Sequence, residues 1–68
     1  MEGTYDKKAD AVQLYLVPRG SERNFARTEE KEKGIMYDYD KQGKIIGIEF
    51  LDASERLPSS FLETLTRI

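Results

Sequence analysis

The feature that most constrains this chain is a pair of alternating segments on either side of a short turn. Over residues 35–40 and 44–51, apolar side chains fall mainly on every second position, which is the period of a strand with one buried face. Between the segments, Asp40 and Gly43 take the first and last positions of a type I turn, and glycine there adopts the left-handed conformation of a bulged hairpin. The sequence therefore predicts a β-hairpin within an antiparallel sheet.

Three earlier segments are also predicted to be strands. In residues 11–17, Val12 and Leu14 share one parity with polar Gln13 on the other, so this strand has one apolar face. A polar run separates it from a short strand near 3–6, which indicates a second hairpin. Residues 25–31 are mostly charged, and charged side chains on an outer strand oppose sheet-to-sheet aggregation. We therefore expect an edge strand there.

The period changes after Leu51, and the change predicts a C-terminal helix near residues 58–67. Apolar residues recur there at spacings of three and four, as on one face of a helix: Leu57, Phe61, Leu62, Leu65 and Ile68. Pro58 suits a first helical turn, and Asp52 or Ser54 is expected to supply the capping oxygen. The helix is expected to cover a sheet face formed by Val12, Leu14, Leu16, Ile46, Ile48 and Phe50.

Together these elements predict a single α+β domain over residues 1–68. It contains a small, mostly antiparallel sheet of four to five strands, with the C-terminal helix packed on one face. The strands are placed near 3–6, 11–17, 25–31, 35–40 and 44–51, and the helix near 58–67. A chain this short buries only about 60% of its unfolded surface. Because it also has no cysteine for disulfides, self-association is favoured as a source of stability.

Composition argues against several classes of partner. Eleven basic residues against thirteen acidic ones give a net charge of −2, so no positive field draws the chain onto a phosphate backbone. No apolar run approaches the length of about 20 residues that a membrane span needs. The first residues lack the basic and apolar regions of a signal peptide. We expect no nucleic-acid partner, no membrane partner and a cytoplasmic location.

Residues 38–49 nearly match a calcium-binding loop, in which carboxylate oxygens surround the ion. The positions in register are Asp38, Asp40, Gly43 and Glu49. Both flanks have the period of strands, whereas an EF-hand needs helices. On a strand that rises about 3.3 Å per residue, Glu49 is expected to lie well away from Asp38. An ordinary hairpin is therefore preferred over a calcium site.

A second acidic set has the residue types of a Mg²⁺ site or an acid–base pair. Its members are Asp6, Asp10, Asp38 and Asp40, with Glu49 as a further metal candidate, and hairpin pairing could bring the aspartates near one end of the sheet. The simpler interpretation is that aspartate favours turns and caps. With no histidine or cysteine, nucleophilic catalysis has no obvious participants. A carboxylate-based, metal-dependent enzyme or cation-binding protein stays as the alternative function, and no cofactor is assigned.

The strands carry more apolar residues than one short helix can cover. Those on the parity away from the proposed core are Ala11, Tyr15, Val17, Ile45 and Leu51. An uncovered apolar patch usually marks an association surface, so these five residues are the candidate interface. The favoured function is a non-catalytic protein-interaction or self-association module. Its expected partner is a second copy of the chain or a small operon-encoded protein.

Spaced residues along nearly the whole chain resemble a small prokaryotic family, domain of unknown function 2283. They are Tyr5, Asp6, Ala9, Asp10, Ala11, Tyr15 and Leu16, then 26–30, then Asp38, Tyr39, Asp40, Gly43, Lys44, Ile45, Gly47, Ile48, Glu49, Leu51, Ala53 and Ser54. The loop at 18–23 looks longer than the family's usual connection. The resemblance implies a compact domain of sheet plus terminal helix in a short bacterial or archaeal protein. It implies no activity, substrate, cofactor or catalytic residue.

Overall fold

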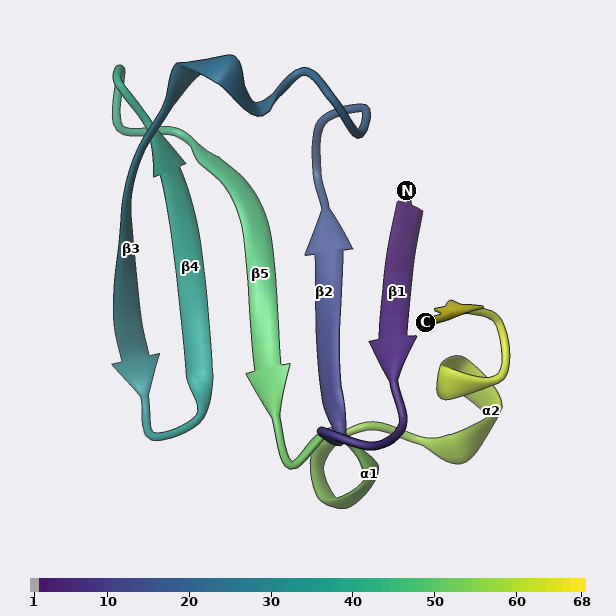
Figure 1. The fold of residues 1–68 in the computed structure, drawn as a ribbon. Helices are drawn as coiled ribbons and strands as arrows, with labels where there is room; N and C mark the ends of the chain where they lie inside the picture. Colours follow the sequence, from purple (N-terminus) through teal and green to yellow (C-terminus); the bar gives the residue numbers. More distant parts are fainter. Residues whose placement is uncertain (1) are drawn as a thin grey trace.

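The computed structural model describes residues 2–68 as one six-stranded sheet with two single-turn α-helices (Figure 1). The strands are β1 (Glu2–Asp6), β2 (Ala11–Tyr15), β3 (Phe25–Glu32), β4 (Ile35–Asp40), β5 (Ile45–Leu51) and β6 (Thr66–Arg67). The helices are α1 (Ala53–Arg56) and α2 (Ser59–Leu62), and a 3₁₀ turn, η1 (Glu22–Asn24), precedes β3. Within these residues, neither helix is long and apolar enough to cross a membrane.

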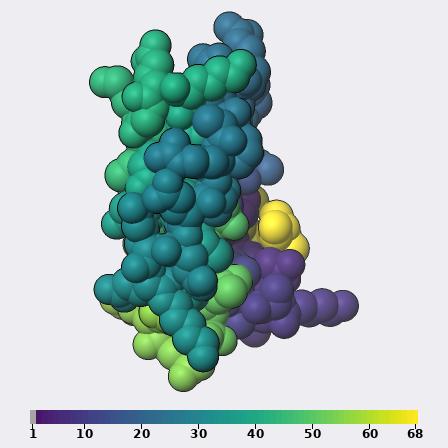
Figure 2. Space-filling view, turned by 90° about the vertical axis from the view of Figure 1, so that its left-hand side faces the viewer, coloured from purple at the N-terminus to yellow at the C-terminus, as the bar shows by residue number. Residues whose placement is uncertain are grey.

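The strand order is β3-β4-β5-β2-β1-β6, and every neighbouring pair is antiparallel except β1 and β6, which are parallel. The connection from β2 to β3 passes beyond the ends of β5 and β4 (Figure 1). The charged strand β3 therefore forms an outer edge, which faces the viewer in dark teal in Figure 2. Two shifts of register also interrupt its pairing with β4. Charge and irregular pairing both make this edge a poor template for another strand.

The structure is consistent with the expected α+β class, and its sheet is mostly antiparallel as expected, but the strand number and the C-terminal helix are corrected. Six strands replace the four to five expected, and no continuous helix spans 58–67. Two single turns and strand β6 take its place, with Pro58 as the N-cap of α2 rather than a residue of its first turn. The helical period predicts a longer helix than the one that forms, because Phe61, Leu62 and Leu65 pack on the core from a single turn and the loop after it. Beyond them the chain turns back to pair with β1, and Ile68 is 71% exposed.

The core lies between α1–α2 and one face of β1, β2 and β5. Its buried members are Tyr5, Val12, Leu14, Ala53 and Leu62, with Ile48, Phe50, Leu57, Phe61 and Leu65 partly buried against them. Two residues that were expected on this face are not part of this cluster. Leu16 follows the end of β2 and is 45% exposed, and Ile46 is the extra residue of a bulge in β5.

The rest of this face, on β3 and β4, is covered by charged side chains instead of a helix. The Arg27 guanidinium lies 4.4 Å from the centre of the Tyr39 ring, and the Lys31 ammonium lies 5.4 Å from the same ring. Glu29 pairs with both cations, at 2.5 Å and 3.2 Å. The aliphatic stems of long basic side chains can shield apolar surface while their charges stay in water.

Asp10 fastens the helical segment to the sheet. Its Oδ1 accepts hydrogen bonds from the Tyr5 hydroxyl at 2.8 Å and the Ser54 amide at 3.0 Å, and its Oδ2 accepts one from the Ser54 hydroxyl at 2.8 Å. The Ala53 amide donates to the Asp10 carbonyl at 2.9 Å. The expected cap from Asp52 or Ser54 is wrong, because Asp52 makes no side-chain cap bond and Ser54 is itself a donor. A capping carboxylate 44 residues away in sequence leaves no local pattern.

Changing Asp10 should therefore lower the melting temperature, whereas the same change at Asp52 should not. Both residues have φ near +50°, which asparagine tolerates, so Asp10→Asn and Asp52→Asn are matched. Hydrogen bonds from Ser54 and Tyr5 lower the pKa of Asp10 below its ordinary value of 3.8. Because its pKa is lower in the folded state, the Asp10 carboxylate stabilises the fold above pH 3.8. This contribution is lost as the pH falls through the folded-state pKa. Thermal unfolding at several pH values should show the gap between wild type and Asp10→Asn closing in acid; equal melting of the two variants at pH 7 would contradict the capping role.

Leu62 in α2 is 6% exposed and belongs to the core, whereas Leu51 in β5 is 45% exposed. Leu62→Ala should lower the free energy of unfolding by about 2–5 kcal/mol, the usual cost of a buried leucine. Leu51→Ala should change it by no more than about 0.5 kcal/mol. Urea unfolding measures both, and a loss at Leu62 no larger than that at Leu51 would show that α2 does not close the core.

Candidate functional site

The sheet face opposite α1 and α2 is the open face, and it carries the candidate site. The strand registers place on it Glu2, Thr4, Asp6, Ala11, Gln13, Tyr15, Phe25, Thr28, Glu30, Met36, Asp38, Asp40, Gly47, Glu49 and Leu51. Six of these residues are acidic and none is lysine or arginine. Both ion pairs found among residues 2–68 lie on the other face, at Glu29. The open face is therefore negatively charged, and none of its carboxylates is neutralised by a salt bridge within the described chain.

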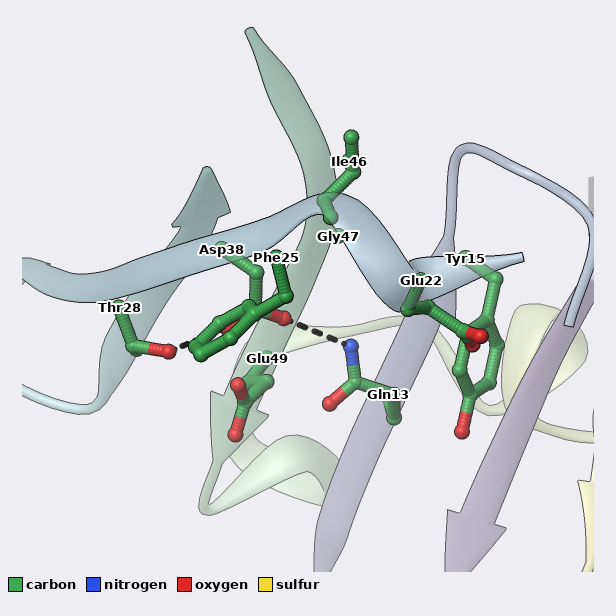
Figure 3. A pocket seen from close by; sticks show the side chains of 9 residues that line it. All are labelled: Gln13, Tyr15, Glu22, Phe25, Thr28, Asp38, Ile46, Gly47 and Glu49. Atoms are coloured by element: carbon green, nitrogen blue, oxygen red, sulfur yellow. Dashed lines mark hydrogen bonds between the residues drawn. The ribbon is translucent and has the colours of Figure 1, made fainter. Parts of the chain in front are cut away.

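A hollow of about 360 Å³ lies in the open face (Figure 3). Four strands and η1 contribute its lining: Gln13, Tyr15, Glu22, Phe25, Thr28, Asp38, Ile46, Gly47 and Glu49. Tyr15, Phe25 and Ile46 supply apolar surface, and Asp38 and Glu49 supply charge. The bulge in β5 accounts for one of these contributions, since it gives Ile46 a place in the hollow.

Asp38 and Glu49 form a carboxyl pair at the centre of the hollow (Figure 3). Asp38 is 9% exposed; its Oδ1 accepts a bond from the Thr28 hydroxyl at 2.7 Å and its Oδ2 accepts one from the Gln13 amide at 3.1 Å. Desolvation opposes ionisation of Asp38, but hydrogen bonds with Glu49, Thr28 and Gln13 outweigh it and lower the Asp38 pKa. The hydrogen-bonding contact with Asp38, together with desolvation and like charge, raises the pKa of Glu49 to about 7.

Gly47 makes room for this arrangement. A Cβ atom at this position would lie 2.6 Å from Asp38 Oδ2 and 3.0 Å from Gln13 Nε2. Any side chain here would therefore push apart the hydrogen bond between Asp38 and Gln13. Sequence alternation does not indicate a need for glycine at this position, because that need comes from side chains on neighbouring strands.

The structure does not bring the four candidate aspartates together. Asp6 and Asp10 lie at the β1–β2 turn, whereas Asp38 and Asp40 lie toward the opposite end of the sheet, near the β4–β5 turn (Figure 1). Asp6 accepts bonds from the amides of the next turn, and Asp40 does the same in the turn between β4 and β5. No group of three or more metal-ligating side chains is assembled anywhere in residues 2–68.

Glu49 lies next to Asp38, contrary to the expectation that it would be remote. The rise of a strand separates the two residues along the chain, but the hairpin folds back and pairs Asp38 with Gly47. Glu49 is two residues beyond Gly47 and points to the same face. The register of the hairpin, and not a calcium loop, brings these two carboxyl groups together.

The five predicted interface residues are distributed unevenly. Ala11, Tyr15 and Leu51 lie on the open face, and Ala11 pairs with Leu51. Val17 lies beyond the end of β2. Ile45 opens β5 opposite Tyr39 and is 40% exposed. The hollow also uses six residues that were not candidate site residues from the sequence, namely Gln13, Glu22, Phe25, Thr28, Ile46 and Gly47.

Removing the charge of Asp38 should lower the pKa of Glu49 from about 7 toward its ordinary range, because repulsion between the carboxylates disappears. Asp38→Asn tests this, and Asp40→Asn is the matched control on the same strand. Carbon-detected NMR titration of the side-chain carboxyls follows Glu49 directly. A wild-type Glu49 that titrates with an ordinary pKa, or one that does not respond to Asp38→Asn, would contradict the pairing.

A protein-family model described as a protein of unknown function (DUF2283) matches residues 4–54. The match covers most of the chain, from β1 to α1, and includes all four strands that line the hollow. No curated protein and no solved structure matches the chain. The resemblance in the spaced residues is confirmed by this match, and the chain belongs to the DUF2283 family of proteins of unknown function.

Proposed function

We propose that the chain is a non-catalytic protein-binding module whose open face receives a positively charged segment of another protein. The observation that carries this proposal is the separation of charge between the two faces. Arg27 and Lys31 lie on one face with Glu29, while the strand residues of the other face include six acids and no base. Complementary charge steers association and selects partners.

The open face also offers apolar contact area. Phe25 and Leu51 are 46% and 45% exposed, and Tyr15 and Met36 are partly exposed. Aromatic residues and methionine are enriched in protein interfaces. The two longest dimensions of the chain are 33 and 24 Å, which gives a face comparable with the roughly 800 Å² that each partner buries in a standard interface.

Charge favours a different protein over a second copy of this chain. Two open faces placed against each other would bring like carboxylates together, which costs binding energy. Pairing through the edge of β3 is opposed by its charged side chains and by its two register shifts. Self-association therefore serves as the main competing outcome of the experiment below.

A carboxylate-based enzyme draws support from one observation, the raised pKa of Glu49 beside an ionised Asp38. Paired carboxyls with separated pKa values occur in acid–base catalysis, but structural networks perturb pKa values as well. A metal-dependent version has no assembled ligand group among residues 2–68. Binding through the open face also accounts for its six acidic residues and its exposed apolar residues, which a single carboxyl pair does not explain.

Site-specific photo-cross-linking in a lysate of the source organism tests the proposal. A benzoylphenylalanine at Leu51, on the open face and outside the hollow, should cross-link to a segment rich in lysine or arginine. The same group at the exposed Ser60 of α2 should not cross-link to that segment. Mass spectrometry of the cross-linked peptide identifies the segment.

Charge reversal supplies the control. Glu2→Lys with Glu30→Lys on the open face should reduce the Leu51 cross-link several-fold, since the attraction is lost. Glu55→Lys with Glu63→Lys changes the net charge equally on the helical side and should leave it intact. Equal effects of both pairs, a cross-link to a neutral or acidic segment, or a cross-link to a second copy of the chain would overturn the proposal.

A further inference from the structure

We propose that the hollow binds the cationic end of one lysine or arginine side chain, with the aliphatic stem of that side chain against Tyr15 and Phe25. The inference rests on the proposed function, because it assigns one contact of the basic segment to one place on the open face. It also adds a requirement that the proposed function lacks, namely that a single charged group enters the hollow.

The shape and walls of the hollow suit such a side chain. Its volume of about 360 Å³ falls within the range of about 300–1,000 Å³ typical of ligand pockets. Tyr15 and Phe25 contribute aromatic rings, and Ile46 adds aliphatic surface (Figure 3). Aromatic faces attract ammonium and guanidinium groups, and apolar walls suit the methylene stem that carries the charge.

The two carboxyl groups at the centre of the hollow are hydrogen-bond acceptors with free capacity. A carboxylate offers about four acceptor sites, and Asp38 uses two of them for Thr28 and Gln13 and a third for its contact with Glu49. No amide, amine or hydroxyl group within residues 2–68 donates to Glu49. A cation seated between the two carboxyls would receive charge-assisted hydrogen bonds, which are stronger than neutral ones, and would offset their mutual repulsion.

The described chain does not supply this cation itself. The lining includes three acids, Glu22, Asp38 and Glu49, and no lysine or arginine. The Arg19 guanidinium lies 5.1 Å from the centre of the Tyr15 ring, but Arg19 does not line the hollow.

An organic cation fits better than a metal ion. Calcium needs six to eight oxygen ligands and magnesium needs an octahedral shell, whereas the hollow combines a few acceptors with aromatic and aliphatic walls. The aromatic walls would contribute little to the binding of a hydrated metal ion. They contribute directly to a charged group on an apolar stem.

NMR titration of the full chain at pH 8, above the pKa of Glu49, tests the inference. The probes are the N-acetyl, N-methylamide forms of lysine and arginine, and the norleucine derivative is the uncharged match for lysine. The charged probes should shift the amide signals of Gly47, Glu49 and Phe25 with saturable, millimolar binding. The norleucine probe should bind about tenfold more weakly, the effect expected from losing one charge-assisted interaction.

Two variants locate the binding. Glu49→Gln keeps the size of the side chain and should weaken the lysine probe about tenfold, while its amide spectrum reports whether the fold is retained. Glu30→Gln, on the open face outside the hollow, should leave the affinity unchanged. Equal binding of norleucine and lysine, or equal effects of the two variants, would overturn the inference.

The outcomes separate this inference from the proposed function. If the charged probes fail to bind while the Leu51 cross-linker still reaches a basic segment, the hollow is not a cation site and the binding module stands. If the probes bind but the cross-linker reaches only a second copy of the chain, the cation site stands and the basic partner does not.

Discussion

The structure depends on the way the helical segment is held to one face of the sheet. Asp10, in the β1–β2 turn, binds the first residues of α1 through its side chain and its carbonyl. Arg56 strengthens the attachment at the other side of α1, because its guanidinium donates to the carbonyls of Leu51 and Lys33. With α1 and α2 fixed there, β1, β2 and β5 gain a cover on one face only.

That one-sided cover explains where the charges lie. The covered side of β3 and β4 still needs shielding, and Arg27 and Lys31 provide it by lying over the tyrosine rings while Glu29 pairs with both cations. The basic residues of β3 that contact the tyrosine rings, Arg27 and Lys31, therefore lie on this side. The opposite side keeps its carboxylates without an ionic partner in the described chain, and Asp38 is the most buried of them.

Much of the sheet could be predicted from the sequence, because alternation and turn chemistry are local signals. The 35–51 hairpin and the strand near residue 11 depend on such signals. The C-terminal segment could not be predicted, since Leu62 and Leu65 meet the core equally well from a long helix or from one turn followed by a loop. Whether residue 66 continues a helix or pairs with β1 depends on the free edge of β1, which only the assembled sheet provides.

The candidate site was less accessible to sequence reasoning than the fold. Its acids were identified individually, but they were grouped by composition instead of register, so Asp6 and Asp10 were assigned to the wrong set. The contact between Asp38 and Glu49 requires knowing that Asp38 faces Gly47 across the hairpin. Gln13, Thr28 and Phe25 reach the hollow from β2 and β3, and no local pattern links those strands to β4 and β5.

The open face is not covered by α1 or α2 and is negatively charged, whereas on the other face of β3 and β4 the bases Arg27 and Lys31 are balanced by Glu29 and Glu32. Solvent paramagnetic relaxation with matched cationic and anionic nitroxides measures this most directly. The account predicts that the cationic probe relaxes the protons of Gln13, Glu49 and Leu51 more strongly than the anionic probe, with a much smaller difference at Arg27 and Lys31, which are paired with Glu29. Equal relaxation by both probes across the open face, or protection of that face from both, would contradict it.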